Sequence, residues 1–139
     1  MTKLYLDNCL YFTSNRLARQ TERLARQAYR PTGLNPTYNY ILLTIAQLNQ
    51  VTLHDLAAKM GIAPSTMSRL IQNLFVKKLI IKQNGWRKIN LKLSSQGKKL
   101  LPLIKKCYFD LDKMVSQQLA DQNKQQLITL LDSQSEQFI

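Results

Sequence analysis

The sequence predicts a mainly helical protein with one small β-hairpin. Apolar residues recur at helical spacing through most of the chain. A stretch near residue 90 instead alternates apolar and polar residues, and an Asn-Gly dipeptide, which favours tight turns, precedes it. The length of 139 residues and the 45% content of hydrophobic residues suit one globular unit.

The positive charge is concentrated in one part of the chain. Residues 56–109 contain no acidic residue, although the chain has eight, and they contain twelve of its twenty basic residues. With a formal net charge of +12, the protein should attract a polyanion such as DNA, RNA or an anionic membrane. No apolar run approaches the roughly 18 residues of a membrane span, and the N-terminus lacks a signal-peptide pattern, so we expect a cytoplasmic protein.

The first expected helix covers residues 6–29. Leu10, Leu17 and Leu24 recur every seven residues and mark its apolar stripe. The pentapeptide Arg-Leu-Ala-Arg-Gln occurs twice along it, which we interpret as a solvated basic face. Pro31 ends the helix, because the residue before a proline is pushed out of the α region.

Two shorter helices should follow. One runs from Asn35 to about Asn49, with Pro36 in its first turn. The next begins near Thr52, where Thr52 and Asp55 resemble a capping box with Asp in place of Glu. Gly61 then supplies a tight turn, since glycine adopts left-handed backbone angles without a Cβ penalty.

The fourth expected helix has an unusual outer face. It restarts at Pro64 and turns Met67, Leu70, Ile71 and Leu74 inward. An ordinary surface helix would be richer in Glu and Lys, whereas hydroxyls, amides and arginine bind phosphates and base edges. The residues left outside are Ser65, Thr66, Ser68, Arg69, Gln72 and Asn73.

A β-hairpin comes next, with strands over residues 79–82 and 89–93 and the turn at Asn84-Gly85. Trp86, Arg87 and Lys88 lie at or beside its tip, and we expect Trp86 to pack against the strands rather than stack on nucleic acid. Ser94 can cap a long helix, and a last helix follows Asp121.

This order of elements predicts a winged helix-turn-helix with a helical dimerisation region. The first helix and the last two carry too much apolar surface to be stable on their own. We expect them to pack together, with a second copy of the chain. We therefore expect three regions: residues 1–34 as the N-terminal dimerisation helix, 35–95 as the winged helix-turn-helix, and 96–139 as the C-terminal dimerisation helices.

The ordered set of these stretches resembles the MarR family of bacterial transcriptional regulators over nearly the whole chain. The matching stretches are 33–36, 52–57, 65–71, and Arg87 leading into 91–97. The resemblance implies a homodimer that binds an inverted repeat in double-stranded DNA, with the fourth helix in the major groove and the wing in the minor groove. The family's contact positions fall on Ser65, Thr66, Ser68, Arg69, Asn73 and the wing-tip Arg87.

The chain departs from the family pattern at two positions. Gly85 stands where the family usually has an Asp that orients the wing arginine, which puts the wing geometry in question. Lys78 follows the recognition helix where the family usually has Gly. Because a lysine in a left-handed cap costs about 1 kcal/mol, we expect the helix to end differently here.

Effector binding is a further implication of the resemblance. Tyr11, Tyr29, Tyr38 and Tyr40 could line a pocket for an aromatic acid, or they could fill space between helices. Some family members sense oxidants through a cysteine in the first helix, and Cys9 and Cys107 lie in the corresponding elements, although buried cysteines are usually inert. The lone His54 predicts no metal site, and no cofactor is expected.

The leading interpretation is a sequence-specific homodimeric repressor that a small effector releases from its operator. The alternatives are a peroxide-sensing regulator that acts through Cys9 and an architectural protein that binds nucleic acid without sequence preference. We reject an enzyme, such as a small thiol peroxidase using Cys9, because the sequence shows no phosphate-binding loop, no paired carboxylates and no nucleophile–His arrangement.

Overall fold

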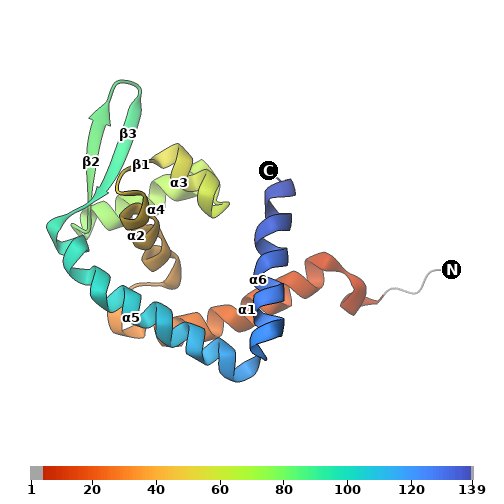
Figure 1. The fold of residues 1–139 in the computed structure, drawn as a ribbon. Coiled ribbons are helices and arrows are strands. Elements are labelled where there is room, and N and C mark those ends of the chain that lie inside the picture. Colours follow the sequence, from red (N-terminus) through yellow and green to blue (C-terminus); the bar gives the residue numbers. More distant parts are fainter. Residues whose placement is uncertain (1–4, 139) are drawn as a thin grey trace. The chain divides into compact units, whose positions relative to one another are not determined.

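A computed structural model describes residues 5–138, which form two compact units (Figure 1). One unit covers residues 29–107, and the other combines 1–28 with 108–139. The two ends of the expected dimerisation region, residues 1–4 and residue 139, lie outside the described part. Within that part, six α-helices and a three-stranded antiparallel sheet confirm the predicted fold class. None of the described helices is both long enough and apolar enough to span a bilayer.

The unit of residues 29–107 has one continuous core. Its helices are α2 (Pro36–Leu48), α3 (Leu53–Met60), α4 (Pro64–Val76) and the first half of α5 (Ser95–Gln118), preceded by the short turn η2 (Arg30–Thr32). Each helix turns its apolar stripe inward, as the spacing predicts. The fully buried side chains include Ile41, Leu42, Ile45, Leu56, Met67, Ile71, Leu74, Leu91 and Ile104.

The sheet of this unit consists of β1 (Val51–Thr52), β2 (Ile80–Gly85) and β3 (Lys88–Leu93), in the order β1-β3-β2. The two-residue strand β1, which the sequence did not predict, pairs with β3 through Val51 and Leu91. Beyond that pairing, β2 and β3 continue as a narrow ribbon that extends away from the helices of the unit (Figure 1). This ribbon is the wing.

The turn of the wing lies two residues later than predicted. Gly85 pairs with Lys88, so the turn consists of Trp86 and Arg87 instead of Asn84-Gly85. The observed register places Ile80 opposite Leu93, and both are buried. A turn at Asn84-Gly85 would have placed Ile80 opposite the exposed Ile89. Burial of the strand base therefore outweighs the local preference for Asn-Gly in the turn.

The helix ends follow the capping signals in the sequence, with one correction. The Thr52 hydroxyl accepts from the Asp55 N–H at 3.1 Å, and Gly61 is left-handed with φ 66°, as predicted. The expectation that Lys78 would change the end of α4 was wrong, because Lys78 adopts the left-handed conformation itself, with φ 63°. The N–H groups of Lys78 and Leu79 close the helix on the carbonyls of Phe75 and Leu74 (2.9 and 3.1 Å).

The start of α5 is fixed against the end of α4. Ser94 caps α5 by accepting from the Gly97 N–H at 3.0 Å, and its hydroxyl donates to the Lys78 carbonyl at 2.6 Å. A Cβ at Gly97 would overlap the carbonyl oxygen of Leu79. Only glycine therefore allows this close approach between the first turn of α5 and the backbone that follows α4.

The other unit contains η1 (Leu6–Asn8), α1 (Leu10–Ala28), the second half of α5, α6 (Asp121–Ser135) and η3 (Glu136–Phe138). The helix predicted to begin at residue 6 begins at Leu10, because Cys9 has an extended backbone (φ −99°, ψ 119°). Lys124 joins α6 to α5 by contacting the Asp112 carboxylate at 3.0 Å and the Ser116 hydroxyl at 2.7 Å.

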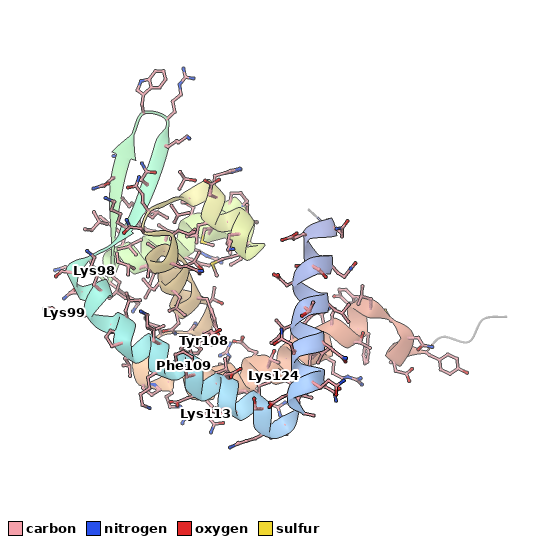
Figure 2. The ribbon with its side chains drawn as sticks, in the orientation of Figure 1. Lys98, Lys99, Tyr108, Phe109, Lys113 and Lys124 are labelled. Carbon is pink, nitrogen blue, oxygen red and sulfur yellow. The ribbon has the colours of Figure 1, made fainter. Side chains whose placement is uncertain are left out.

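The helices of this unit leave large apolar side chains exposed. Tyr108 and Phe109, which pack edge to face with ring centroids 5.3 Å apart, are both exposed on α5 (Figure 2). Exposed side chains occur on the other helices too, so the unit has no closed core of its own. They are Leu6, Leu10, Tyr11, Ile128, Leu130 and Leu131.

Candidate nucleic-acid interface

The outer face of α4 has the composition that the sequence predicts. Met67, Ile71 and Leu74 are buried and fix the rotation of the helix about its axis. The opposite face carries hydroxyl and amide groups, which can both donate to and accept from base edges, and a guanidinium group, which only donates. Its residues are the half-buried Thr66 and the exposed Ser65, Ser68, Arg69, Gln72 and Asn73.

The N-terminus of α4 is suited to bind an anion. Ala63 is the N-cap and provides no side-chain cap, and the first turn holds no acidic residue. The first intrahelical bond runs from the Met67 N–H to the Ala63 carbonyl at 2.9 Å, which leaves the N–H groups of Ser65 and Thr66 directed outward. These donors and the positive end of the helix dipole favour a phosphate.

Two residues near the end of α4 are held by neighbouring elements. The Asn73 amide donates to the Tyr38 hydroxyl of α2 at 2.8 Å. The Gln72 carbonyl oxygen accepts from the Lys82 ammonium of β2 at 2.6 Å, and this ammonium lies 4.7 Å from the centre of the Phe75 ring. Both amides keep unused polar groups, and these contacts orient them. The role of Lys82 was not predicted, because it depends on the register of β2 beside α4.

The wing tip differs from the predicted packing. Trp86 is 85% exposed instead of lying against the strands. The Arg87 guanidinium lies 4.5 Å from the centre of the Trp86 ring, so the two side chains stack on each other. Arg87 is left-handed with φ 66°, a conformation that costs a residue with a Cβ about 1–2 kcal/mol. The tip therefore presents a cation and an indole from a strained turn, with the exposed Lys88 beside them.

The charge around this interface is positive and nearly uncompensated. Asp55 is the only carboxylate in the sequence from residue 29 to residue 107. Arg69, Arg87 and Lys88 form no ion pair with any residue from 5 to 138. Such a surface attracts a polyanion over a distance of about one Debye length, which is roughly 8 Å at physiological salt.

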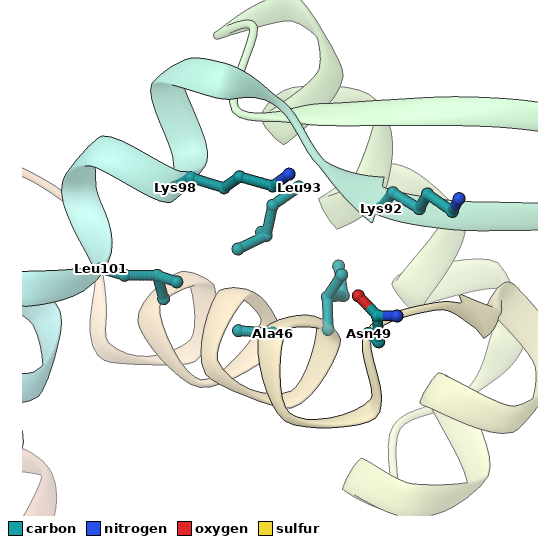
Figure 3. Close-up of a pocket in the computed structure, with 7 residues that line it drawn as sticks. Ala46, Asn49, Lys92, Leu93, Lys98 and Leu101 are labelled. Atoms are coloured by element: carbon teal, nitrogen blue, oxygen red, sulfur yellow. The ribbon is translucent and has the colours of Figure 1, made fainter.

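Of the residues predicted for effector and redox roles, Tyr38 contacts α4 through the Asn73 amide. Tyr29 is buried with its ring 5.4 Å from that of Tyr40, edge to face, whereas Tyr11 is 78% exposed. Cys9 is exposed and Cys107 is buried. A cavity in the 29–107 unit is lined by none of the four tyrosines (Figure 3). Their effector role and the redox role of the cysteines stay predictions. In the described part of the chain, no cluster of His, Cys, Asp and Glu could hold a metal.

These features define the class of protein, which is a winged helix-turn-helix protein with an added helical unit. Residues 34–84, from the start of α2 through most of β2, match the MarR family. The resemblance to this family that was read from the sequence is therefore confirmed over these residues.

Solved structures of such regulators have the same fold over nearly the whole chain. CouR from Rhodococcus jostii RHA1, bound to p-coumaroyl-CoA, is 20% identical, with 94% of each chain covered and a TM-score of 0.80. CouR bound to a 23-mer DNA duplex is 18% identical, with 96% of this chain and 99% of that chain covered and a TM-score of 0.84. A MarR-family regulator from Rhodococcus sp. RHA1 is 20% identical, with 94% of this chain and 95% of that chain covered and a TM-score of 0.83. No curated protein is similar enough in sequence to count as a match.

Proposed function

We propose that this protein is a sequence-specific transcriptional repressor that binds double-stranded DNA as a homodimer. In each subunit α4 enters the major groove, and the wing tip reaches the adjacent minor groove. The observation that carries this proposal is the outer face of α4. Short polar side chains and Arg69 are exposed on this face, while the apolar residues on the opposite face of the helix are buried. The structural likeness to CouR, which has been solved on a DNA duplex, supports the same mode of binding.

Sequence specificity is favoured over nonspecific binding by the kind of residue on this face. A nonspecific binder needs only lysine and arginine, because phosphates carry no sequence information. Here five of the six predicted contact residues on α4 are neutral, and Gln72 and Asn73 are oriented by Lys82 and Tyr38. Preorganised amides and hydroxyls of this kind discriminate between base edges.

Dimerisation is favoured by the exposed apolar residues of the helical unit. Phe109 is 61% exposed and Leu130 is 58% exposed, and α1 also has exposed apolar residues at its start. Apolar surface on three helices is unfavourable in water and is typical of an interface. A two-fold dimer would present two copies of α4 and would therefore require an inverted-repeat operator with half-sites about one helical turn apart.

A direct test begins with selecting binding sites for the full chain from random DNA duplexes. An inverted repeat should emerge, and Arg69→Ala should weaken binding to it by about 1–3 kcal/mol while binding to random DNA changes less. Lys77→Ala, which removes one charge at the end of the same helix, is the matched control and should weaken both DNAs alike. Equal losses on both DNAs for Arg69→Ala would reduce this residue to a phosphate contact and contradict its role in reading sequence.

A further inference from the structure

The wing holds the side chain of Gln72 in one orientation. The Gln72 carbonyl oxygen accepts from the Lys82 ammonium at 2.6 Å, while Gln72 itself is exposed on the outer face of α4. An ammonium group only donates hydrogen bonds, so the end of the amide that faces Lys82 has to be the oxygen and not the nitrogen. This charge-assisted bond engages the oxygen and leaves the NH2 group, with its two N–H donors, as the end of Gln72 that can bind a ligand.

The Lys82 side chain is itself held from several sides. Lys82 lies on the same face of β2 as the buried Ile80, because side chains two residues apart in a strand point to the same side. Its partner across the hairpin, Leu91, is also buried. At the other end, the ammonium lies 4.7 Å from the centre of the Phe75 ring, which adds a cation–π contact. Lys82 is therefore half-buried and has much less freedom to turn than a lysine in solvent.

The neighbouring amide of Asn73 is held without the same consequence. It donates to the Tyr38 hydroxyl at 2.8 Å. A hydroxyl group both donates and accepts, so it can bind either end of an amide. Tyr38 therefore fixes the place of the Asn73 amide, whereas Lys82 also fixes which end of Gln72 faces outward.

The outward end of an amide determines which base it selects. In the major groove, guanine presents two acceptors, N7 and O6, whereas adenine presents one acceptor and one amino donor. A glutamine that turns freely pairs best with adenine, through one donor and one acceptor. A glutamine whose oxygen is engaged offers only donors, which match guanine and oppose the amino group of adenine. The exposed Arg69, three residues earlier on the same face of α4, is also a donor-only group.

We propose that Lys82 is a positioning residue that gives Gln72 a preference for guanine in the operator. The inference rests on the proposed function, because it requires α4 to lie in the major groove, and it adds which base edge the site selects. Lys82 reads no base itself. It acts through Gln72, so that a residue of the wing determines what α4 recognises.

The link between Lys82 and Gln72 can be measured without DNA. The side-chain NH2 signals of Gln72 are recorded by NMR on the full chain and identified by their loss in Gln72→Ala. Lys82→Met keeps the length of the side chain and its contact with Phe75 but removes the donor, so it should move these signals to those of a solvated amide. Lys92→Met is the matched control. Lys92 is also half-buried but lies opposite Ile81, on the other face of the hairpin, and its loss should leave the signals in place.

The base preference is measured on the operator obtained by site selection. Each base pair of the half-site is varied in turn, and the position at which Gln72→Ala abolishes the preference is the one that Gln72 reads. The wild type should bind guanine there about tenfold more tightly than adenine, equivalent to about 1.4 kcal/mol. Lys82→Met should lose this preference or shift it to adenine, and Lys82→Arg, which still donates, should keep it. A purely structural role of Lys82 would instead lower the affinity for all duplexes by the same factor.

A substitution of Gln72 tests the same idea with Lys82 in place. In Gln72→Glu the carboxylate still pairs with the Lys82 ammonium but has no donor of its own. The preference for guanine should therefore be replaced by one for cytosine, whose amino group donates to a carboxylate. A retained preference for guanine would contradict the role of the Gln72 NH2 group.

The inference and the proposed function fail in different ways. The inference alone is overturned if Lys82→Met leaves the Gln72 signals in place, if Gln72→Ala changes no base preference, or if the wild type favours adenine at the position that Gln72 reads. It is also overturned if Lys92→Met changes the preference as Lys82→Met does. A chain that selects no inverted repeat would refute the proposed function and the base preference together, whereas the NMR signals decide by themselves whether Lys82 holds Gln72.

Discussion

At the scale of single residues, Arg87 combines an unfavourable backbone conformation with an exposed, positively charged side chain. Its left-handed φ of 66° would suit glycine, yet the side chain there is an arginine stacked on Trp86 at 4.5 Å. The strain is retained at the tip of the wing, where the side chain contacts Trp86 and not the core. This combination is typical of a residue kept for binding and not for stability.

Substitution of Arg87 by glycine should therefore lower the affinity for DNA without lowering the stability of the fold. Arg87→Gly relieves the turn, so the free energy of unfolding should stay the same or rise slightly. Affinity for DNA should fall, and the slope of log K against log salt should become less negative by about 0.9 if one phosphate contact is lost. Arg87→Ala keeps the strain and should show the same loss of DNA binding. An unchanged salt slope in both variants would argue against contact between the wing tip and DNA.

The sequence predicted most of the residues on the outer face of α4, because burial of Met67, Ile71 and Leu74 leaves only one orientation for the others. It did not predict which of them are held in place. The contacts of Gln72 with Lys82 and of Asn73 with Tyr38 join positions 10 and 35 residues apart in the chain. Contacts over such separations depend on the packing of α2, α4 and β2, which periodicity does not specify.

At the scale of elements, the helix order and the caps could be predicted because their signals are local. Pro36, Thr52, Gly61 and Pro64 each act within one helical turn, and the structure uses each as predicted. The wing turn and the break at Cys9 could not be predicted in the same way. The turn depends on the burial of Ile80 and Leu93 at the other end of the hairpin, and nothing in the local sequence marks the extended Cys9.

The left-handed end of α4 makes a prediction about stability. Lys78→Gly removes a steric penalty of roughly 1–2 kcal/mol and adds an entropic one of roughly 0.5–1 kcal/mol, so the protein should gain about 0.5–1 kcal/mol. Lys77→Gly is the matched control, because Lys77 is right-handed with φ −75° and should only lose stability. Urea denaturation measures both variants. A loss of stability in Lys78→Gly would mean that the end of α4 does not have the geometry described.

The close approach at Gly97 makes the opposite prediction. Gly97→Ala forces either the first turn of α5 or the Leu79 carbonyl to move, and it should lower the free energy of unfolding by about 1–3 kcal/mol. Gln96→Ala changes an exposed neighbour in the same turn and should stay within about 0.5 kcal/mol of the wild type. Equal stability of the two variants would show that the backbones are not in contact.

At the scale of the whole molecule, the two units differ in how completely each buries its own apolar side chains. The 29–107 unit has a closed core, whereas the helices of the other unit expose Phe109, Leu130 and Leu131. A chain of 16.1 kDa with this distribution should sediment at about twice that mass at micromolar concentration.

Dimerisation can be tested by placing charge on the exposed apolar surface. Phe109→Glu should raise the dissociation constant of the dimer, because burial of a phenylalanine contributes about 1.5–3 kcal/mol per subunit. Lys113→Glu, one helical turn further along α5, places a glutamate at a polar position and changes the net charge by two units instead of one, yet it should have a much smaller effect (Figure 2). Sedimentation velocity measures both. A wild-type chain that stays monomeric would refute the homodimer.

The position of Trp86 has a practical consequence for kinetic experiments. It is the only tryptophan of the chain, and it is 85% exposed at the wing tip, beside Arg87. Its intrinsic fluorescence therefore reports on one end of one element, without any attached dye. A stopped-flow record of that emission would time the arrival of the wing on the duplex, while the anisotropy of labelled DNA times the arrival of the protein as a whole. Any delay between the two signals would measure how long the complex exists before the wing is in place.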